Sequence, residues 1–356
     1  MAEAIGSTEA SQPVREAHRF DETSLADYLS KNLDGFSGPL SVRQFAGGLS
    51  NPTYLLETPA RKYVLRRKPP GVLLKSAHAV DREFRVMSAL HKVGFPVPRP
   101  HLLCDDDSVI GTMFFVMEHI PGRIFIDCTM PTISRAERAA VFDSVNETLA
   151  KLHDVKLKET GLDDYGRPGN YFGRQISRWS TQYQQSKTQA IPEMDKLMAW
   201  LPGAVPPESK PSLIHGDFSF HNVLIHPTEP RVVAVVDWEL STLGDPLGDL
   251  TYHAMEWYRP PGVDGRGTLG GADLSALGVP TLEEYVARYC ERMGFAPIEN
   301  LSFYRAYNLF RVAAIVQGVV GRAATGASAN DPSEHAWRVR PLAVAAWEEA
   351  QKAGAI

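Results

Sequence analysis

The stretch LIHGDFSFHNVLI, residues 213–225, decides the fold. It begins with apolar residues, passes through a polar loop and ends in an apolar run typical of a strand. A second run, VVAVVDWE at residues 232–239, reads as a buried strand that ends abruptly in carboxylates. Because a short PTEP turn at residues 227–230 joins the two runs, they predict a β-hairpin.

The polar residues around this hairpin predict a metal and proton-transfer site. If residues 223–225 pair with 232–236, Asn222 and Asp237 lie at the same end of the hairpin, and Asp217 lies in the loop before it. A carboxylate at the end of a buried strand is costly unless it has a partner. Mg²⁺ prefers oxygen ligands and often combines one or two carboxylates with nucleotide phosphates. Asn222 and Asp237 are therefore candidate Mg²⁺ ligands, and Asp217 is positioned to accept a proton from an attacking hydroxyl.

A simpler interpretation is that these aspartates only cap turns, as Asp often does. For Asp217 or Asp237 alone, that interpretation is as good as the functional one. For Asp217, Asn222 and Asp237 together at this spacing, we favour the functional one. His215 is different, because a His before Gly-Asp is expected to hold loop backbone rather than to do chemistry.

The spacing also resembles a known family. Asn222 follows Asp217 by five positions and Asp237 follows it by about 20, as in the catalytic loop and metal-binding Asp of the protein-kinase-like fold. The HGD motif at 215–217, DWE at 237–239 and LGDPLGDL at 243–250 are similar to the aminoglycoside phosphotransferase and choline kinase family. The resemblance covers roughly residues 40–320.

This resemblance implies an ATP-dependent phosphotransferase with an alcohol group as acceptor. It makes Asp217 the catalytic base and Asn222 and Asp237 the ligands of Mg²⁺, with Glu239 as a further candidate to assist the metal. The segment 243–250 is expected to buttress the site, with Asp245 and Asp249 satisfying backbone amides.

The rest of the chain fits an α+β, protein-kinase-like bilobal fold. Strand-like runs at 40–45, 53–57, 62–67, 102–104 and 113–117, with a helix at 77–92, predict a small antiparallel sheet with one inserted helix. Beyond Pro121-Gly122 the pattern becomes mainly helical, with helices expected at about 134–153, 281–294, 303–320 and 334–352. We therefore predict a flexible tail at 1–19, a nucleotide-binding N-lobe at 20–120 and a catalytic C-lobe at 121–356.

A glycine pair lies where the resemblance expects a phosphate-binding loop. Gly47 and Gly48 lie between two predicted strands, and backbone N–H groups in such a loop can cover phosphates. A Gly-Gly hairpin alone is more often a plain turn. Its place before the other motifs favours the phosphate-binding role, and Ser50 and Asn51 are predicted to add side-chain donors.

Kinase-like folds also need a cation on the third strand and a Glu on the following helix. The strand reads YVLRRK at 63–68, which places Arg66 at the usual Lys position and leaves Arg67 and Lys68 as alternatives. Arg binds phosphate well in a bidentate manner. Glu83 falls on the apolar stripe of the helix at 77–92, so an inward cation, Arg66, is expected to meet it. The alternative is a Glu at the edge of the stripe that reaches solvent.

The run MFFVMEHI at 113–120 resembles the strand that enters the interlobe hinge. The resemblance places the backbone of Glu118 and Ile120 beside the adenine ring of ATP. A core strand without any such role explains the apolar residues equally well.

Composition narrows the class of protein. Of the 356 residues 44% are apolar and 22% charged, which is close to an average soluble globular protein. The net charge of −5 without a basic stripe argues against a nucleic-acid partner. No apolar stretch approaches the roughly 20 residues that span a bilayer, and the polar first 19 residues lack a secretory signal, so no membrane partner is expected. Three widely spaced cysteines fit a reducing cytoplasm.

The sequence constrains the identity of the phosphate acceptor less than it constrains the reaction. Residues 63–71 and 77–83 resemble the kinase-like domains that are fused to, or encoded with, acyl-CoA dehydrogenases. That resemblance implies a hydroxyacyl thioester or related small-molecule metabolite as substrate and a functional link to an acyl-CoA dehydrogenase. An antibiotic phosphotransferase is a weaker alternative, because a polycationic drug needs clustered carboxylates and the C-terminal half has no dense run of acidic residues. A nucleotide-binding pseudokinase or regulatory module is another alternative. The Gly- and Pro-rich stretch 259–280 is predicted to be a lid or substrate loop.

Overall fold

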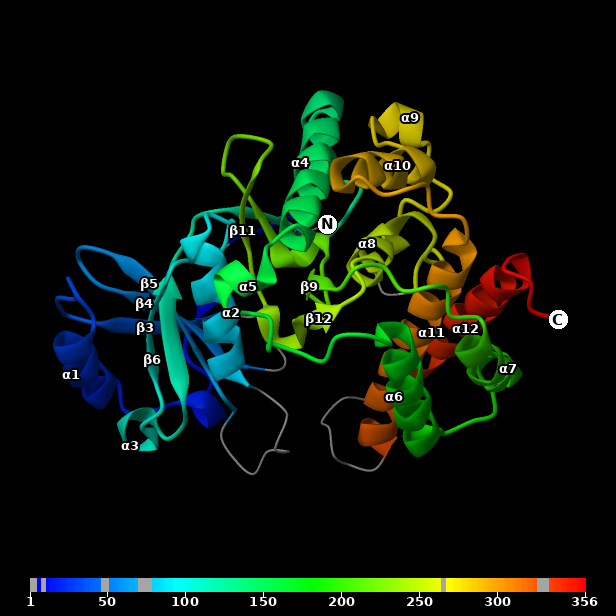
Figure 1. The fold of residues 1–356 in the computed structure, drawn as a ribbon. Helices are drawn as coiled ribbons and strands as arrows, with labels where there is room; N and C mark the ends of the chain where they lie inside the picture. The colour runs from blue at the N-terminus through cyan, green and yellow to red at the C-terminus, as the bar shows by residue number, and fades with distance from the viewer. Residues whose placement is uncertain (1–4, 8–10, 46–50, 70–78, 264–266, 325–332) are drawn as a thin grey trace. The chain divides into compact units, whose positions relative to one another are not determined.

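The computed structural model describes residues 5–7, 11–45, 51–69, 79–263, 267–324 and 333–356 (Figure 1). The chain divides into two compact units. The first comprises Met1–Ile124, Lys156–Leu162 and His221–Ser241, and the second comprises Phe125–Val155, Asp163–Phe220 and Thr242–Ile356.

This division differs in two segments from the predicted split at residue 121. The first cut follows Ile124, close to that position, but Lys156–Leu162 and His221–Ser241 return to the first unit. The latter segment carries the predicted hairpin, whose strand β10 (Val223–Ile225) pairs with β8 (Arg123–Phe125). The former packs on α2 (Val80–Lys92), where the Arg85 guanidinium donates to the Gly161 carbonyl at 2.8 Å. Both segments belong to the first unit because they contact residues far away in the sequence.

The first unit contains the expected antiparallel sheet with one inserted helix, α2. The six strands run in the order β2-β3-β4-β5-β7-β6, and every neighbouring pair is antiparallel. Their bounds are β2 Ser11–Gln12, β3 Ser41–Phe45, β4 Thr53–Glu57, β5 Lys62–Arg67, β6 Pro100–Cys104 and β7 Phe114–Glu118.

The two faces of this sheet bury different sets of side chains. Helix α1 (Glu22–Asn32) and the short α3 (Asp107–Ile110) cover one face, where Leu25 and Leu29 pack in a core with Tyr63 and Leu65. Helix α2 covers the other face, with the ring of Phe84 against Phe115 of β7 at 6.0 Å. Because successive strand residues alternate between faces, Val64 and Arg66 lie on the α2 side.

The second half of the predicted tail at residues 1–19 contacts the sheet, and its flexibility stays a prediction. Ser11 pairs with Phe45 at the edge of the sheet, and the Arg43 guanidinium donates to the Ser11 carbonyl at 2.6 Å. The Tyr54 hydroxyl donates to the His18 carbonyl at 2.9 Å. Polar composition predicted a tail, but backbone pairing with an open sheet edge needs no apolar side chains.

The predicted hairpin is present in a second, four-stranded sheet of order β1-β8-β10-β11. Strands β1 (Ile5–Ser7) and β11 (Val232–Val235) form its edges, and Val223 pairs with Val235.

The second unit is mainly helical, as predicted. Four helices match the expected ones: α4 Arg135–His153, α10 Leu282–Met293, α11 Leu301–Ala324 and α12 Ser333–Lys352. Further elements are α6 Tyr171–Ser186, α7 Pro192–Trp200, α8 Leu247–His253 and the two-stranded sheet of β9 Ser212–Ile214 with β12 Thr242–Gly244. Among the helices that the structure describes, none has the length and apolar character needed to cross a bilayer.

The stretch 259–280 is less irregular than its composition suggests. It contains a short helix, α9 (Leu274–Leu277), capped by the side chain of Asp273. Arg259 is buried and pairs with Glu256 at 2.7 Å. The described part of this stretch is therefore anchored to the helical unit, and its role as a lid stays a prediction.

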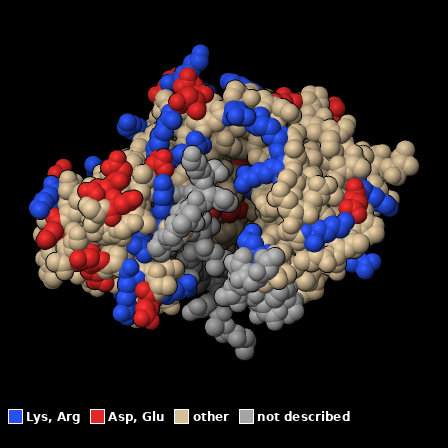
Figure 2. Space-filling view, turned by 90° about the horizontal axis from the view of Figure 1, so that it is seen from below, with Lys and Arg blue, Asp and Glu red and all other residues tan. Residues whose placement is uncertain are grey.

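At the left of the face drawn in Figure 2, Lys and Arg side chains lie among Asp and Glu side chains.

Candidate active site

The predicted ion pair between Arg66 and Glu83 is present in the first unit. The Nε atom of Arg66 lies 2.8 Å from Oε2 of Glu83, and both side chains are almost fully buried. The Nη2 atom of the same guanidinium lies 2.5 Å from Oδ1 of Asp237 and 3.3 Å from Oε2 of Glu239. One buried cation therefore binds three carboxylates that come from α2 and from the end of the hairpin.

Strand alternation decides which arginine occupies this position. Arg67 points to the opposite face of the sheet, where it donates to the carbonyls of Ile110 at 3.2 Å and His18 at 3.1 Å. Its guanidinium also lies over the rings of Phe20 and Tyr54, at 5.1 and 5.6 Å. Arg67 therefore stabilises the α1 side of the sheet, and Arg66 is the arginine that faces the carboxylates.

The cluster carries excess negative charge. Burial opposes the charge of Arg66, but attraction to Glu83, Asp237 and Glu239 raises the pKa of its guanidinium, so it stays protonated. Burial raises the pKa of Glu83 to about 7, an effect that Arg66 opposes and that Asp237 and Glu239 reinforce. Three carboxylates thus share one guanidinium, which leaves negative charge in the cluster that Arg66 alone does not neutralise.

The hairpin places both predicted metal ligands at one end, as expected. Val223 pairs with Val235, and the N–H of Val236 donates to the Asn222 carbonyl at 2.9 Å. Asp237 follows directly in a left-handed backbone conformation with φ of 67°. Asp and Asn tolerate that conformation better than other side chains.

These donors fit Mg²⁺ chemically. Asn222 and Asp237 supply a neutral and an anionic oxygen, and nucleotide phosphates commonly complete such a site. Only Oδ1 of Asp237 is bound by Arg66, and Oδ2 has no hydrogen-bond partner among the described residues. That second oxygen is thus available for a cation while the ion pair with Arg66 persists.

The predicted phosphate loop is only partly described. Gly47, Gly48 and Ser50 lie outside the described residues. Asn51 is buried, and its side-chain amide donates to Oε2 of Glu239 at 3.2 Å. The structure therefore brings the end of this loop to the same carboxylates that surround Arg66.

The predicted hinge leaves part of its backbone free for a ligand. The N–H of Glu118 donates to the Arg99 carbonyl at 2.8 Å, so it is not available to a base. The N–H of Ile120 forms no hydrogen bond with any other described residue. Contact of adenine with Glu118 and Ile120 stays a prediction.

The loop that carries Asp217 is anchored within the second unit. The backbone N–H groups of His215 and Gly216 donate to the two oxygens of Asp249 at 2.5 and 2.8 Å. The N–H of Asp217 donates to Nδ1 of His215 at 3.2 Å. Gly216 has a φ of 84°, which favours glycine at this turn. His215 thus contacts backbone, as expected for a residue that holds the loop, and Asp249 binds loop amides as expected.

Asp249 is itself held by residues that the sequence did not indicate. His153 Nε2 lies 3.4 Å from Oδ2 of Asp249, and His153 Nδ1 lies 2.5 Å from the Tyr289 hydroxyl. Burial alone would raise the pKa of Asp249, but the bonds and charges of His153 and His215 together lower it. The loop is therefore anchored on a charged carboxylate.

Arg311 is a second anchor that sequence reasoning missed. Its guanidinium is buried and donates to the Gly216 carbonyl at 2.6 Å. It also lies over the rings of Tyr252 and Trp179, at 4.6 and 5.7 Å. An arginine among the apolar residues Leu309, Phe310 and Val312 of helix α11 was the available signal, since a buried charge needs a partner.

The predicted residues are thus divided between the two units. Asn51, Arg66, Glu83, Glu118, Ile120, Asn222 and Asp237 belong to the first unit, and Asp217 belongs to the second. The convergence of Asp217 with the two metal ligands stays a prediction.

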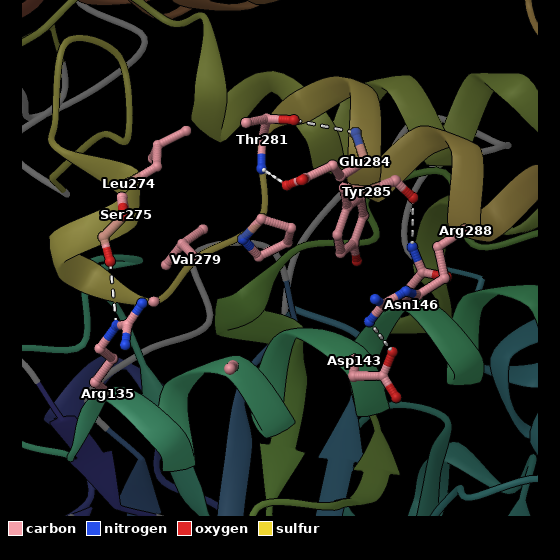
Figure 3. Close-up of a pocket in the computed structure, with 13 residues that line it drawn as sticks. Arg135, Asp143, Asn146, Leu274, Ser275, Val279, Thr281, Glu284, Tyr285 and Arg288 are labelled. Atoms are coloured by element: carbon pink, nitrogen blue, oxygen red, sulfur yellow. Dashed lines mark hydrogen bonds and ion pairs between the residues drawn. The ribbon is translucent and has the colours of Figure 1, made fainter.

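A separate pocket of about 400 Å³ in the second unit contains none of these residues; it lies at α4, α9 and α10 (Figure 3). Its polar groups bind one another. Arg288 pairs with Asp143 at 2.7 Å, and Arg135 Nε donates to the Ser275 carbonyl at 3.1 Å. Thr281 and Glu284 cap α10 reciprocally. This pocket is held together by its own hydrogen bonds, and we assign no ligand to it.

Three features are typical of kinase-like phosphotransferases. They are a buried Arg–Glu pair on an antiparallel sheet, a hairpin that carries Asn and Asp at one end, and an anchored loop with Asp in a helical unit. The sequence supports that class directly. A model described as "Phosphotransferase enzyme family" matches residues 41–290, and the chain belongs to this family.

One curated relative and two solved structures are similar to the chain. The chain is 46% identical over 340 residues to acyl-CoA dehydrogenase family member 11 of Gallus gallus, covering 93% of this chain and 43% of that protein. It thus spans less than half the length of the curated relatives it matches. A crystal structure from Ralstonia eutropha, provisionally described as an aminoglycoside phosphotransferase, is 45% identical, with a TM-score of 0.85 and coverage of 94% of this chain and 99% of that one. A spectinomycin phosphotransferase in complex with ADP and spectinomycin, at 12% identity and a TM-score of 0.60, covers 92% of this chain and 98% of that one and shares the fold.

Proposed function

We propose that this chain is an ATP-dependent small-molecule kinase that transfers the γ-phosphoryl group to a hydroxyl of a metabolite. The observation that carries the proposal is the buried Arg66–Glu83 pair bonded to the partly exposed Asp237, beside Asn222. Phosphoryl transfer depends mainly on positioning and on neutralising the phosphate charge, and this cluster combines a fixed guanidinium with oxygen donors for a divalent cation. Membership of the phosphotransferase family supports it independently.

Each residue has a distinct role in this proposal. Glu83 fixes the Arg66 guanidinium, which then contacts the phosphates of ATP. Asn222 and Asp237 hold Mg²⁺, which when bound neutralises charge on the phosphates. Asp217 accepts the proton of the acceptor hydroxyl as the new O–P bond forms and the bond from the γ-phosphorus to the β–γ bridging oxygen breaks, which releases ADP.

The remaining predicted residues would bind the nucleotide. Gly47, Gly48 and Ser50 cover the phosphates, Asn51 supports that loop from the Glu239 side, and the backbone of Glu118 and Ile120 binds adenine. ADP in the spectinomycin phosphotransferase, which shares the fold, supports an adenine nucleotide.

For the acceptor, we propose the hydroxyl of a hydroxyacyl thioester. The support is the name of the Gallus gallus relative, an acyl-CoA dehydrogenase family member, of which this chain matches only 43%. A kinase unit carried with an enzyme of acyl thioesters is expected to act on a related thioester. A functional link to an acyl-CoA dehydrogenase and a cytoplasmic location form part of this proposal.

An aminoglycoside-type antibiotic phosphotransferase is the second candidate, favoured by the description of the Ralstonia eutropha structure. A pseudokinase that only binds nucleotide is the third. It is the weakest of the three, because Asp217, Asn222 and Asp237 are all present.

Mass spectrometry distinguishes these functions. The protein is incubated with ATP, Mg²⁺ and separate panels of hydroxyacyl-CoA thioesters and aminoglycosides. We expect one phosphoryl group to be added to a hydroxyacyl thioester. Asp217→Asn should abolish that product without loss of nucleotide binding, while Asp163→Asn, an exposed Asp of the same unit, should leave it unchanged. Product on aminoglycosides alone would assign the second function, and unchanged turnover by Asp217→Asn would refute the role of Asp217.

A further inference from the structure

A cationic pocket of about 480 Å³ lies in the first unit, away from the cluster around Arg66. Its lining includes Arg61, Lys62, Tyr63, Arg99, His101 and Glu118. These residues come from β5, β6 and β7 and from the segments next to them.

The pocket lies on the opposite face of the sheet from the candidate active site. Tyr63 and Arg66 are three positions apart on β5, so their side chains point to opposite faces. Tyr63 belongs to the core cluster of Leu25 and Leu29 on the α1 side, whereas Arg66 binds Glu83 of α2. The pocket therefore lies on the face of the sheet away from Arg66, although Glu118, His119 and Pro121 of the predicted hinge also line it.

Positive charge predominates in the lining. Arg61 and Arg99 are exposed, and neither guanidinium forms an ion pair with another described residue. Lys62 pairs with Glu57 at 3.3 Å, and Glu118 accepts from the Arg99 backbone N–H at 3.3 Å. The balance favours an anionic ligand, because the one carboxylate that lines the pocket faces three basic side chains.

The pKa of His101 is lowered by burial and by the same positive charges. Burial lowers the pKa of its ring, and the charges of Arg99, Arg61 and His91 lower it further, opposed by Glu118. Its ring is also in edge contact with Tyr63, with centroids 5.5 Å apart. His101 thus lies close to the arginines and to Tyr63 and can serve as a local probe.

Tyr63 supplies an independent indication of a ligand. The residue is 2% exposed, and its hydroxyl has no hydrogen-bond partner among the described residues. A buried hydroxyl without a partner is costly, and native structures rarely leave one. Because the hydroxyl itself is covered in this structure, an oxygen of a bound anion would satisfy it after neighbouring side chains move aside.

We propose that this pocket binds a phosphate group, free or as a monoester, through the guanidinium groups of Arg61 and Arg99 with the Tyr63 hydroxyl as a further donor. Arginine binds phosphate through paired N–H donors, and such charge-assisted bonds are roughly twice as strong as neutral ones. The ligand chemistry is that of a tetrahedral dianion, and Arg61 and Arg99 have no role in the site proposed for ATP.

The test follows the ring resonances of His101 by NMR, assigned with His101→Gln, while inorganic phosphate or glycerol phosphate replaces chloride at constant ionic strength. We expect saturable shifts and a rise in the pKa of His101, because a bound anion stabilises the protonated ring. A response to both ligands would assign recognition to the phosphate group, and a response to glycerol phosphate alone would assign the site to monoesters.

Arg61→Gln/Arg99→Gln should weaken this binding about tenfold or more, the loss expected for charge-assisted hydrogen bonds. Tyr63→Phe should weaken it by a smaller factor without loss of folding. Arg231→Gln, an exposed arginine of the same unit that pairs with Glu229, is the matched control and should change nothing. The proposal would be overturned if neither ligand shifted the His101 resonances. It would also be overturned if the double variant bound phosphate as tightly as the wild type.

Discussion

The Nη2 atom of Arg66 lies 2.5 Å from Oδ1 of Asp237, although the two residues are 171 positions apart in the chain. The proposed phosphate-binding cation and the proposed metal ligand are thus directly bonded. Removing either one leaves the other in a changed electrostatic environment. Variants of this cluster must therefore be compared by stability and by nucleotide binding together.

Glu83→Ala should destabilise the protein and weaken nucleotide binding. Truncating one partner of a buried ion pair typically costs about 3–5 kcal/mol. We expect a value near the lower end, about 3 kcal/mol, because Asp237 and Glu239 still bind Arg66. Denaturant unfolding and calorimetric titration with ADP measure the two effects. Asp81→Asn, an exposed position on the same helix, should change both much less; equal effects from the two variants would contradict a specific role for Glu83.

Asp237→Asn should remove the Mg²⁺ dependence of nucleotide binding while the fold remains. Asn tolerates the left-handed backbone at φ of 67°, so the turn is preserved, but the anionic oxygen is lost. The affinity for ADP is measured once in the presence of Mg²⁺ and once with a chelator in place of Mg²⁺, and the two values are compared. The wild type should bind more tightly with Mg²⁺, and the variant should bind equally in both conditions. A Mg²⁺ effect that survives in the variant would exclude Asp237 as a ligand.

Much of this cluster was predictable from the sequence because strand periodicity fixes it. The runs 53–57, 62–67 and 223–225 are strands with those bounds. The sequence left Arg66 and Arg67 as alternatives, and their contacts in the structure decide between them. The apolar stripe of α2 correctly indicated that Glu83 points inward. Local pattern was sufficient for the strands and for the inward side of α2, whereas the bonds of Arg66 to Asp237 and Glu239 join segments far apart in sequence and were not predicted.

Features that depend on distant contacts were not predictable in this way. Helices α6 and α7 were not predicted from the sequence. Helix α6 packs on α11, which is more than a hundred positions away in the chain. The N-terminal strand β2 forms by backbone pairing and leaves no apolar signal. Arg311 contacts Gly216 across 95 positions, and nothing local to either residue indicates that bond.

His253 should make the protein sensitive to acid. Its ring is buried among Phe218, Phe220, Trp257 and Tyr285, and both ring nitrogens lack hydrogen-bond partners among the described residues. Burial lowers its pKa from 6.5 to about 3. The unfolded chain therefore binds a proton between these two pH values while the folded chain does not, so stability is lost as pH falls from 6.5 towards 3.

The variant His253→Phe keeps an aromatic ring and removes this titration. We expect a higher Tm at neutral pH, because an unsatisfied buried polar group costs about 1–3 kcal/mol. The fall in stability between pH 6.5 and 3 should also become shallower. His226→Phe, at a half-buried His in the hairpin turn, provides the comparison. Parallel stability–pH curves for wild type and His253→Phe would contradict the prediction.

Arg311→Lys should reduce kcat while nucleotide affinity stays unchanged. Lysine keeps the charge but cannot both donate to the Gly216 carbonyl and stack on Tyr252 and Trp179 as the planar guanidinium does. The turn before Asp217 should then shift, and misplacement of a catalytic group by about 1 Å can cost about a hundredfold in rate. Arg288→Lys, at an exposed position that can keep its pair with Asp143, is the matched control. Steady-state kinetics and ADP titration separate the outcomes: a loss of ADP affinity equal to the loss of kcat would indicate general unfolding, and unchanged kcat would show that Arg311 does not position the loop.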